Sequence, residues 1–151
     1  MGKKILTVFI CTLMCCILGA CGKEPTCSAD SCEESVYKND MCKKHYQEDV
    51  FVGTWYAEFK RQKDEGITGK KGDKITCTIE VYKGGTGRIY WTTNGKDGSN
   101  VSIEWEVNDD CDVLALDYSI GGHPSHVGFE YNAEDNTMIK QDARYEVYSK
   151  Q

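Results

Sequence analysis

The sequence predicts an all-β fold for the region that begins at Phe51. Apolar and polar residues alternate with a period of two in segments such as 75–81 and 101–107, as in strands with one buried and one wet face. Turn-forming pairs, including Gly84-Gly85 and Asn94-Gly95, separate these segments. No stretch beyond Phe51 shows a convincing helical period. We therefore expect a small antiparallel meander, closed as a barrel or flattened into a β-sandwich.

Eight candidate strands follow from the alternation and the turns. They are residues 52–61, 73–83, 86–93, 100–107, 112–119, 125–131, 137–141 and 143–149. The spacing of about ten to twelve residues, with short turns, is typical of strands that each pair with the next one. The residues expected on the inward face are Trp55, Phe59, Ile75, Ile79, Val81, Val101, Ile103, Trp105, Leu114, Leu116, Val127, Phe129, Tyr145 and Val147. This set is large enough for one compact core.

The first 21 residues have the pattern of an export signal. Lys3 and Lys4 precede an uncharged apolar run over residues 5–18, which is long enough for a signal sequence and short for a membrane-spanning helix. The run ends in Leu18-Gly19-Ala20-Cys21. This ending resembles the lipobox of bacterial lipoprotein precursors. An ordinary secretory signal or an uncleaved anchor is the alternative.

The lipobox resemblance implies a membrane-anchored protein. Residues 1–20 are then a signal peptide, and Cys21 becomes the first residue and is acylated on sulfur. A diacylglycerol with palmitate-type chains supplies the two acyl chains that stable anchoring requires. Residues 21–26 form a lipidated tether, and the protein lies on the extracytoplasmic side of the cell membrane.

The charge of the chain excludes two classes of partner. The formal net charge is −6, and removal of Lys3 and Lys4 with the signal makes the mature chain more acidic still. Nucleic-acid binding requires clustered cations against phosphate, so no nucleic-acid partner is expected. The sequence also offers no basic patch for an anionic lipid surface.

The nine cysteines fall into groups along the chain. Three belong to the signal, Cys21 takes the lipid, and five thiols remain, an odd number that cannot all pair within one chain. Cys77 and Cys111 lie in the β region and are a possible disulfide.

The other three thiols form a motif with a histidine. Cys27, Cys32, Cys42 and His45 have the spacing C-x4-C-x9-C-x2-H, and three thiolates with one imidazole make a closed tetrahedral set for structural zinc. Residues 27–46 resemble short bacterial metal-binding modules in which an aromatic residue, here Tyr46, follows the histidine. Disulfide bonds in an oxidising exterior are the alternative. Either link would order a segment too short to fold alone.

The start of the β region carries a second resemblance. Gly53-Thr54-Trp55 resembles the G-x-W signature that opens the first strand of lipocalin-like (calycin) barrels. The resemblance implies that Trp55 closes one end of a barrel formed by residues 51–151, and that a cation from the last strand packs over it. Arg144 is the candidate, through a cation–π contact.

No enzymatic activity is expected. No nucleophile or pair of carboxylates has a recognised catalytic context, and His123 and His126 are expected in a polar hairpin loop. We expect a cell-surface lipoprotein whose β domain binds a small apolar or amphipathic ligand or a component of the cell envelope. The alternative is a protein-interaction or inhibitor domain without a ligand pocket. An internal cavity would distinguish the two.

Overall fold

The computed structural model of the chain describes residues 24–64 and 69–151. The chain divides into two compact units, one up to Lys43 and one over Lys44–Gln151. The expected signal peptide and Cys21 lie outside the described residues. Within the described residues, no helix has the length and apolar character needed to cross a bilayer.

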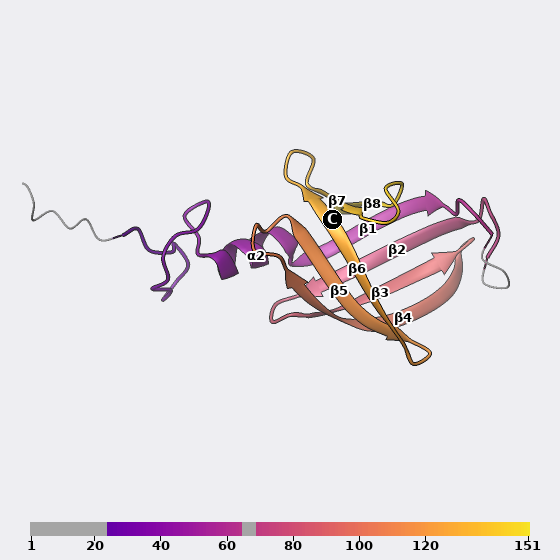
Figure 1. Ribbon diagram of the computed structural model, residues 1–151, viewed down its shortest axis with the longest axis horizontal. Helices are drawn as coiled ribbons and strands as arrows, with labels where there is room; N and C mark the ends of the chain where they lie inside the picture. The colour runs from indigo at the N-terminus through magenta and orange to yellow at the C-terminus, as the bar shows by residue number, and fades with distance from the viewer. Residues whose placement is uncertain (1–23, 65–68) are drawn as a thin grey trace, which may run out of the picture. The chain divides into compact units, whose positions relative to one another are not determined.

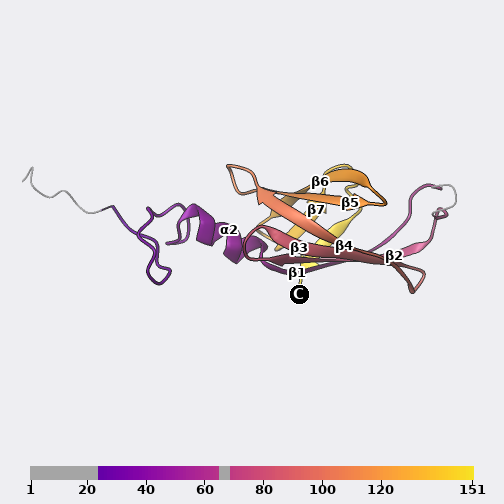
Figure 2. The same ribbon diagram turned by 90° about the horizontal axis from the view of Figure 1, so that it is seen from below.

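The second unit is a β-barrel preceded by a helix (Figure 1). The elements are α2 (Lys43–Phe51), β1 (Gly53–Lys60), β2 (Lys74–Tyr82), β3 (Thr86–Thr93), β4 (Lys96–Val107), β5 (Val113–Ile120), β6 (His123–Asn132), β7 (Thr137–Lys140) and β8 (Val147–Lys150). Each strand pairs with the next, and β1 also pairs with β8, which closes the sheet. Figure 2 shows β1 to β4 along one side and β5 to β7 along the other. The all-β prediction and its barrel alternative are confirmed, whereas the sandwich is not.

A tight turn moves the start of one strand. Between β3 and β4, Asn94 and Gly95 adopt φ angles of 51° and 74°, the positive values that a two-residue type I′ hairpin requires. Thr93 therefore pairs with Lys96 directly across the turn. For this reason β4 begins at Lys96 rather than at residue 100 as predicted.

The barrel core is built largely from the residues expected to face inward. The predicted core residues that are buried are Trp55, Ile75, Ile79, Val81, Ile103, Leu114, Leu116 and Phe129. Four more, Phe59, Val101, Trp105 and Val127, are half-buried. The period-two alternation thus places most of the first six strands correctly.

The last strand has the opposite phase to the predicted one. Tyr145 and Val147, expected in the core, have exposed fractions of 46% and 42%, whereas Tyr148 is buried. Turns separate β7 from β8, so the strand begins only at Val147. Its register is set by the pairing of Tyr148 with Met138, which is buried as well. Turn residues do not follow the strand period, and counting alternation through them reverses the faces.

Aromatic side chains pack at the end of the barrel where β1 begins. Helix α2, which the sequence did not predict, ends at Phe51, and this residue and Trp55 are fully buried. Their ring centroids lie 5.4 and 6.2 Å from that of Tyr131. The Trp55 indole Nε1 also donates a hydrogen bond of 2.8 Å to the Phe51 carbonyl. These contacts fix α2 against the first strand.

The cation over Trp55 is Lys150, which corrects the expectation for Arg144. The Lys150 Nζ lies 5.6 Å from the ring centroid of Trp55 and donates hydrogen bonds to the carbonyls of Asp49, at 2.9 Å, and Val50, at 2.7 Å. Burial lowers the pKa of Lys150. Arg144 lies in the turns before β8 and forms a two-point ion pair with Glu130, at 3.0 and 3.2 Å. Arg144 was the only arginine in the predicted strand 143–149, but β8 begins at Val147, so Arg144 is not part of the last strand.

Gly53 makes room for this lysine. A Cβ atom on Gly53 would lie 3.0 Å from Cε of Lys150, tighter than about nine in ten real Cβ contacts. The φ angle of Gly53 is 138°, which side chains rarely adopt. The first residue of the G-x-W segment therefore has a steric and a conformational reason to be glycine.

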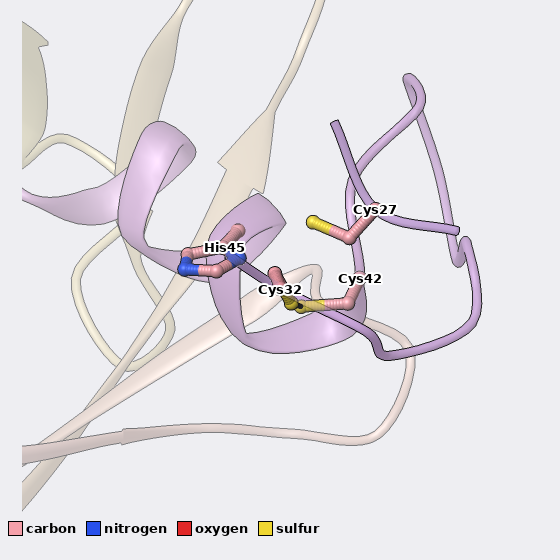
Figure 3. Close-up of side chains that lie close together, drawn as sticks. All are labelled: Cys27, Cys32, Cys42 and His45. Carbon is pink, nitrogen blue, oxygen red and sulfur yellow. Dashed lines mark hydrogen bonds between the residues drawn. The ribbon is translucent and has the colours of Figure 1, made fainter. Parts of the chain in front are cut away.

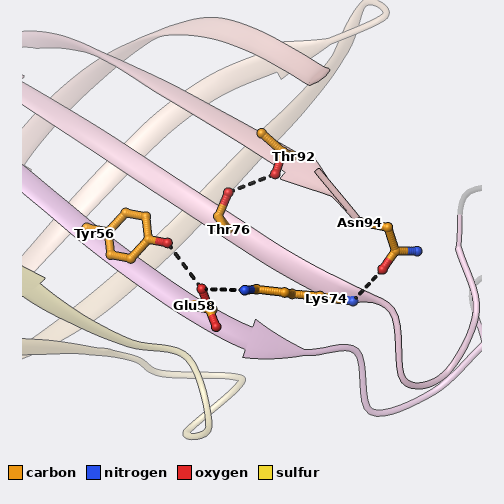
Figure 4. Close-up of polar contacts among 6 residues, drawn as sticks. All are labelled: Tyr56, Glu58, Lys74, Thr76, Thr92 and Asn94. Carbon is orange, nitrogen blue, oxygen red and sulfur yellow. Dashed lines mark hydrogen bonds and ion pairs between the residues drawn. The ribbon is translucent and has the colours of Figure 1, made fainter. Parts of the chain in front are cut away.

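The outer face of β1 to β3 is polar (Figure 4). Glu58 pairs with Lys74 at 2.9 Å and accepts a hydrogen bond from the Tyr56 hydroxyl at 3.4 Å. The hydroxyls of Thr76 and Thr92 lie 2.8 Å apart. This face matches the alternation of the sequence, with polar side chains opposite the core.

We predict that Lys150→Met lowers the free energy of unfolding by about 1–3 kcal/mol, because it removes two hydrogen bonds from a charged donor and a cation–π contact. Chemical denaturation followed by circular dichroism measures the change. Arg144→Met is the control, and loss of its exposed ion pair should cost less than about 1 kcal/mol. Equal losses in the two variants would contradict the assignment of Lys150.

Candidate metal site and barrel cavity

Residues 24–43 fold as a series of tight turns. Backbone amides donate hydrogen bonds from Cys27 to the Glu34 carbonyl, at 2.9 Å, and from Cys32 to the Ala29 carbonyl, at 3.1 Å. Ser31 has a φ angle of 60°, the left-handed conformation that glycine adopts most easily, and turns the chain just before Cys32. These turns bring the first two cysteines of the motif to one place.

A second turn delivers the other two residues of the motif. Asn39 and Asp40 both have positive φ angles, 52° and 59°, and the Ser28 amide donates to the Asp40 carbonyl at 2.7 Å. The chain then reaches Cys42 and enters α2, which carries His45 in its first turn. Cys42 therefore lies at the end of this turn, and His45 lies in the first turn of the helix that follows.

The four residues of the motif form one cluster (Figure 3). The three Sγ atoms and a ring nitrogen of His45 all lie within 4.8 Å of one another. The Sγ atoms of Cys32 and Cys42 are 3.8 Å apart, much longer than the ~2.0 Å of a disulfide bond. Cys27 and Cys42 are buried. The cluster predicted from the spacing is therefore assembled, at distances that a single metal ion can bridge.

The donor set suits a soft or borderline metal. Thiolate and imidazole are ligands of zinc and copper(I), whereas calcium and magnesium prefer oxygen. The pKa of the Cys32 thiol is raised: a backbone hydrogen bond from Glu34 lowers it, but burial and hydrogen bonds with the Cys27 and Cys42 thiols together raise it. A bound metal must displace these thiol protons. Among the described residues, no second group of three or more potential ligands comes together in this way.

The barrel contains a cavity of about 310 Å³ in the half away from α2. Its walls are formed by the end of β1, the start of β2 and the neighbouring parts of the other strands. The lining residues are Phe59, Arg61, Ile75, Cys77, Ile89, Trp91, Tyr118, Ile120, Val127, Phe129, Lys140, Tyr145, Glu146 and Tyr148. This volume is at the lower end of the range that small-molecule sites occupy.

Aromatic rings line the cavity at two depths. Phe129 and Tyr148, both buried, meet edge to face with ring centroids 5.2 Å apart and form part of the floor. Phe59 and the exposed Tyr145 meet in the same manner at 5.9 Å, nearer to solvent. Both pairs have the geometry that aromatic rings prefer, so they form stable walls.

A polar group interrupts the apolar lining. Lys140 Nζ lies 3.4 Å from one oxygen of the Glu146 carboxylate, and the Tyr148 hydroxyl donates to the other oxygen at 3.3 Å. Burial raises the pKa of Glu146 by more than the neighbouring Lys140 and Tyr148 lower it. Burial also raises the pKa of Tyr118 and that of Tyr148. The cavity thus combines an apolar body with one charged, hydrogen-bonding wall.

The sequence did not predict this polar wall. Lys140 and Glu146 stand among charged and turn-forming neighbours, and nothing in their spacing separates them from surface residues. Only the true phase of β8 shows that Tyr148 and Glu146 belong to the interior. The apolar residues of the lining, by contrast, were partly expected, since Phe59, Val127 and Phe129 follow the strand period.

Cys77 and Cys111 are thiols and do not form the disulfide that the sequence allowed. Cys77 faces the cavity, where burial raises its pKa to about 11. Cys111 lies in the turn between β4 and β5 with a φ angle of 57° and accepts a hydrogen bond of 3.5 Å from Gln47. The two cysteines are in different halves of the barrel, and strand phase alone cannot show this separation.

His123 and His126 lie at the beginning of β6, in agreement with a polar hairpin. The His126 Nδ1 is 2.8 Å from a carboxylate oxygen of Asp117 on the neighbouring strand, and both side chains are exposed. His126 thus pairs with Asp117 across the hairpin. Neither histidine joins a larger group of potential ligands in the described part of the chain.

Comparison of this chain with models of protein families, with curated proteins and with solved structures gives no match.

Proposed function

We propose that the protein is a lipid-anchored binding protein of the cell surface, whose lipocalin-like barrel holds a small apolar or amphipathic ligand. The cavity is the observation that carries this proposal. It is a half-open hollow among the strands, lined by apolar and aromatic side chains together with Arg61, Lys140 and Glu146, and large enough for a small molecule. A domain that acts only through its outer surface would have no use for it, and small barrels can fill their interiors with side chains. The cavity therefore supports ligand binding over the interaction or inhibitor alternative.

We predict that Val127→Trp weakens binding of a neutral fluorescent apolar probe at least tenfold, because the larger side chain occupies much of the cavity. Fluorescence titration of the mature chain, residues 21–151 with Cys21→Ser, measures the affinity. Val147→Trp is the matched control, since Val147 points outward from β8. Equal affinity in the two variants would contradict binding in the cavity, as would the absence of any binding by the unsubstituted chain.

Zinc is the metal that we propose for the cysteine and histidine cluster. Tetrahedral zinc with bonds of ~2.3 Å to sulfur separates two sulfurs by ~3.8 Å, which agrees with the 3.8 Å between Cys32 and Cys42. Four protein ligands leave no open coordination position. The proposed role is therefore structural, and it would hold together a segment that has little apolar surface to bury.

We predict about one zinc ion per mature chain after purification without chelator, and loss of at least nine-tenths of it in Cys42→Ser. Elemental analysis by mass spectrometry gives the stoichiometry. Cys111→Ser is the control, because this buried cysteine lies outside the cluster. A metal-free protein in which Cys27, Cys32 and Cys42 are oxidised would contradict the zinc proposal and favour disulfides.

The proposal of a lipid anchor is supported by the signal and lipobox pattern of the sequence. We predict that Cys21→Ser moves the protein from the membrane fraction to the soluble fraction of the producing cell, because no acyl chain is attached. Fractionation with immunoblotting measures the distribution, and labelling with radioactive palmitate should mark the unsubstituted protein alone. Persistent membrane association of the variant would overturn the anchor assignment.

A further inference from the structure

The ion pair of Lys140 and Glu146 is unusually sheltered for a pair at a barrel end. The exposed fractions of the two side chains are 23% and 10%. The outer pair of Lys74 and Glu58 has 55% and 49%. The inner pair is therefore less accessible to solvent, and it lines the cavity. A ligand that enters the cavity would lie against this pair.

A wholly apolar ligand would bind poorly against this wall. It would remove water from Lys140, Glu146 and the Tyr118 hydroxyl without replacing the hydrogen bonds. Leaving buried polar groups unpaired costs free energy, and the cost is larger for charged groups than for neutral ones. The best ligand for this cavity therefore carries a polar head group.

The charges around the wall select the kind of head group. Arg61 and Lys140 line the cavity as cations, and Glu146 lines it as an anion. Asp142, 3.6 Å from Lys140, adds a second anion at the exposed side. These four charges balance. An extra charge on the ligand would be desolvated in the cavity without an unmatched counter-ion, which is unfavourable.

We propose that the ligand of the cavity is an uncharged amphiphile, with a hydroxyl or amide head group that hydrogen-bonds to the Lys140–Glu146 pair and an apolar body between the aromatic pairs. A head group of this class can accept from the Lys140 ammonium and donate to the Glu146 carboxylate. At the ~30 Å³ that a water molecule occupies in the liquid, the cavity holds about ten non-hydrogen atoms. The inference rests on the proposed ligand-binding function and narrows it.

Matched eight-carbon compounds test this inference. Isothermal titration calorimetry at pH 7.5 would compare 1-octanol, octanamide, octanoate and octylammonium on the mature chain. We expect the two uncharged compounds to bind at least about tenfold more tightly than either ion, because only the ions bring an uncompensated charge into the site. Octanoate or octylammonium binding as tightly as 1-octanol would overturn the inference and leave the proposed function intact. No binding by any of the four would overturn both.

Two variants test whether the ion pair sets the preference. Glu146→Gln leaves Lys140 without its buried anion and should strengthen octanoate binding relative to 1-octanol at least about tenfold. Lys140→Met should shift the preference toward octylammonium in the same way. Glu58→Gln, on the outer face, is the matched control and should leave the ranking unchanged. A ranking that stays the same in both inner variants, shown to be folded by circular dichroism, would overturn the inference. If either variant does not fold, the ranking in the unsubstituted chain decides.

Discussion

The anchoring of the last strand to the helix before the first one is the constraint on which the barrel depends. Lys150, the final residue of β8, donates hydrogen bonds to two carbonyls at the end of α2 and lies over Trp55 on β1. An interaction across 100 residues of sequence thereby joins the two ends of the domain. Its geometry favours glycine at position 53, because the φ angle there is 138° and a Cβ atom would lie only 3.0 Å from Lys150 Cε. Lys150 covers the Trp55 ring, and Trp55 and the neighbouring Phe51 are both fully buried. A barrel has no free edges, so its closure at β1 and β8 also removes the exposed strand that an open sheet would present.

The two ends of the barrel consequently differ in character. At the α2 end, Phe51, Trp55 and Tyr131 fill the interior with interlocking rings. At the other end, the inward side chains leave space, and the lining becomes a mixture of aromatic rings and a sheltered ion pair. The side chains that line the cavity make fewer contacts than those of a filled core, which lowers stability. The close packing of rings at the α2 end offsets this loss. The cysteine and histidine cluster lies in a segment with little apolar surface to bury. It can hold together a short segment through four ligands rather than through buried apolar surface.

Local patterns explain what could be predicted from the sequence. Period-two alternation and the Asn94-Gly95 turn are local signals, and they predicted an antiparallel meander, as a barrel or a sandwich, and most of its strands. The C-x4-C-x9-C-x2-H spacing predicted which side chains would meet, because all four lie within a short segment whose turns bring them together. The phase of β8 could not be predicted in the same way. It depends on the pairing of Tyr148 with Met138 across turns that do not keep the strand period. The errors over Tyr145 and Val147 follow from that one phase, and so does the failure to place Glu146 in the cavity. The error over Arg144 follows from the predicted start of the strand, because β8 begins only at Val147. Cys77 and Cys111 illustrate the same limit, since their separation depends on which half of the barrel each strand position occupies.

The proposed function depends on ligand binding in the cavity. Backbone amide resonances of the ¹⁵N-labelled mature chain, recorded during titration with 1-octanol, would locate the site directly. If the ligand binds in the cavity, the largest saturable changes in chemical shift will fall on Ile89, Phe129, Lys140 and Tyr148, which line it. The chemical shifts of Tyr90, Asp97 and Asn100, which line a hollow on the outer face, will then stay unchanged. Shifts confined to that outer hollow, or shifts that rise without saturation over the whole surface, would contradict binding in the cavity.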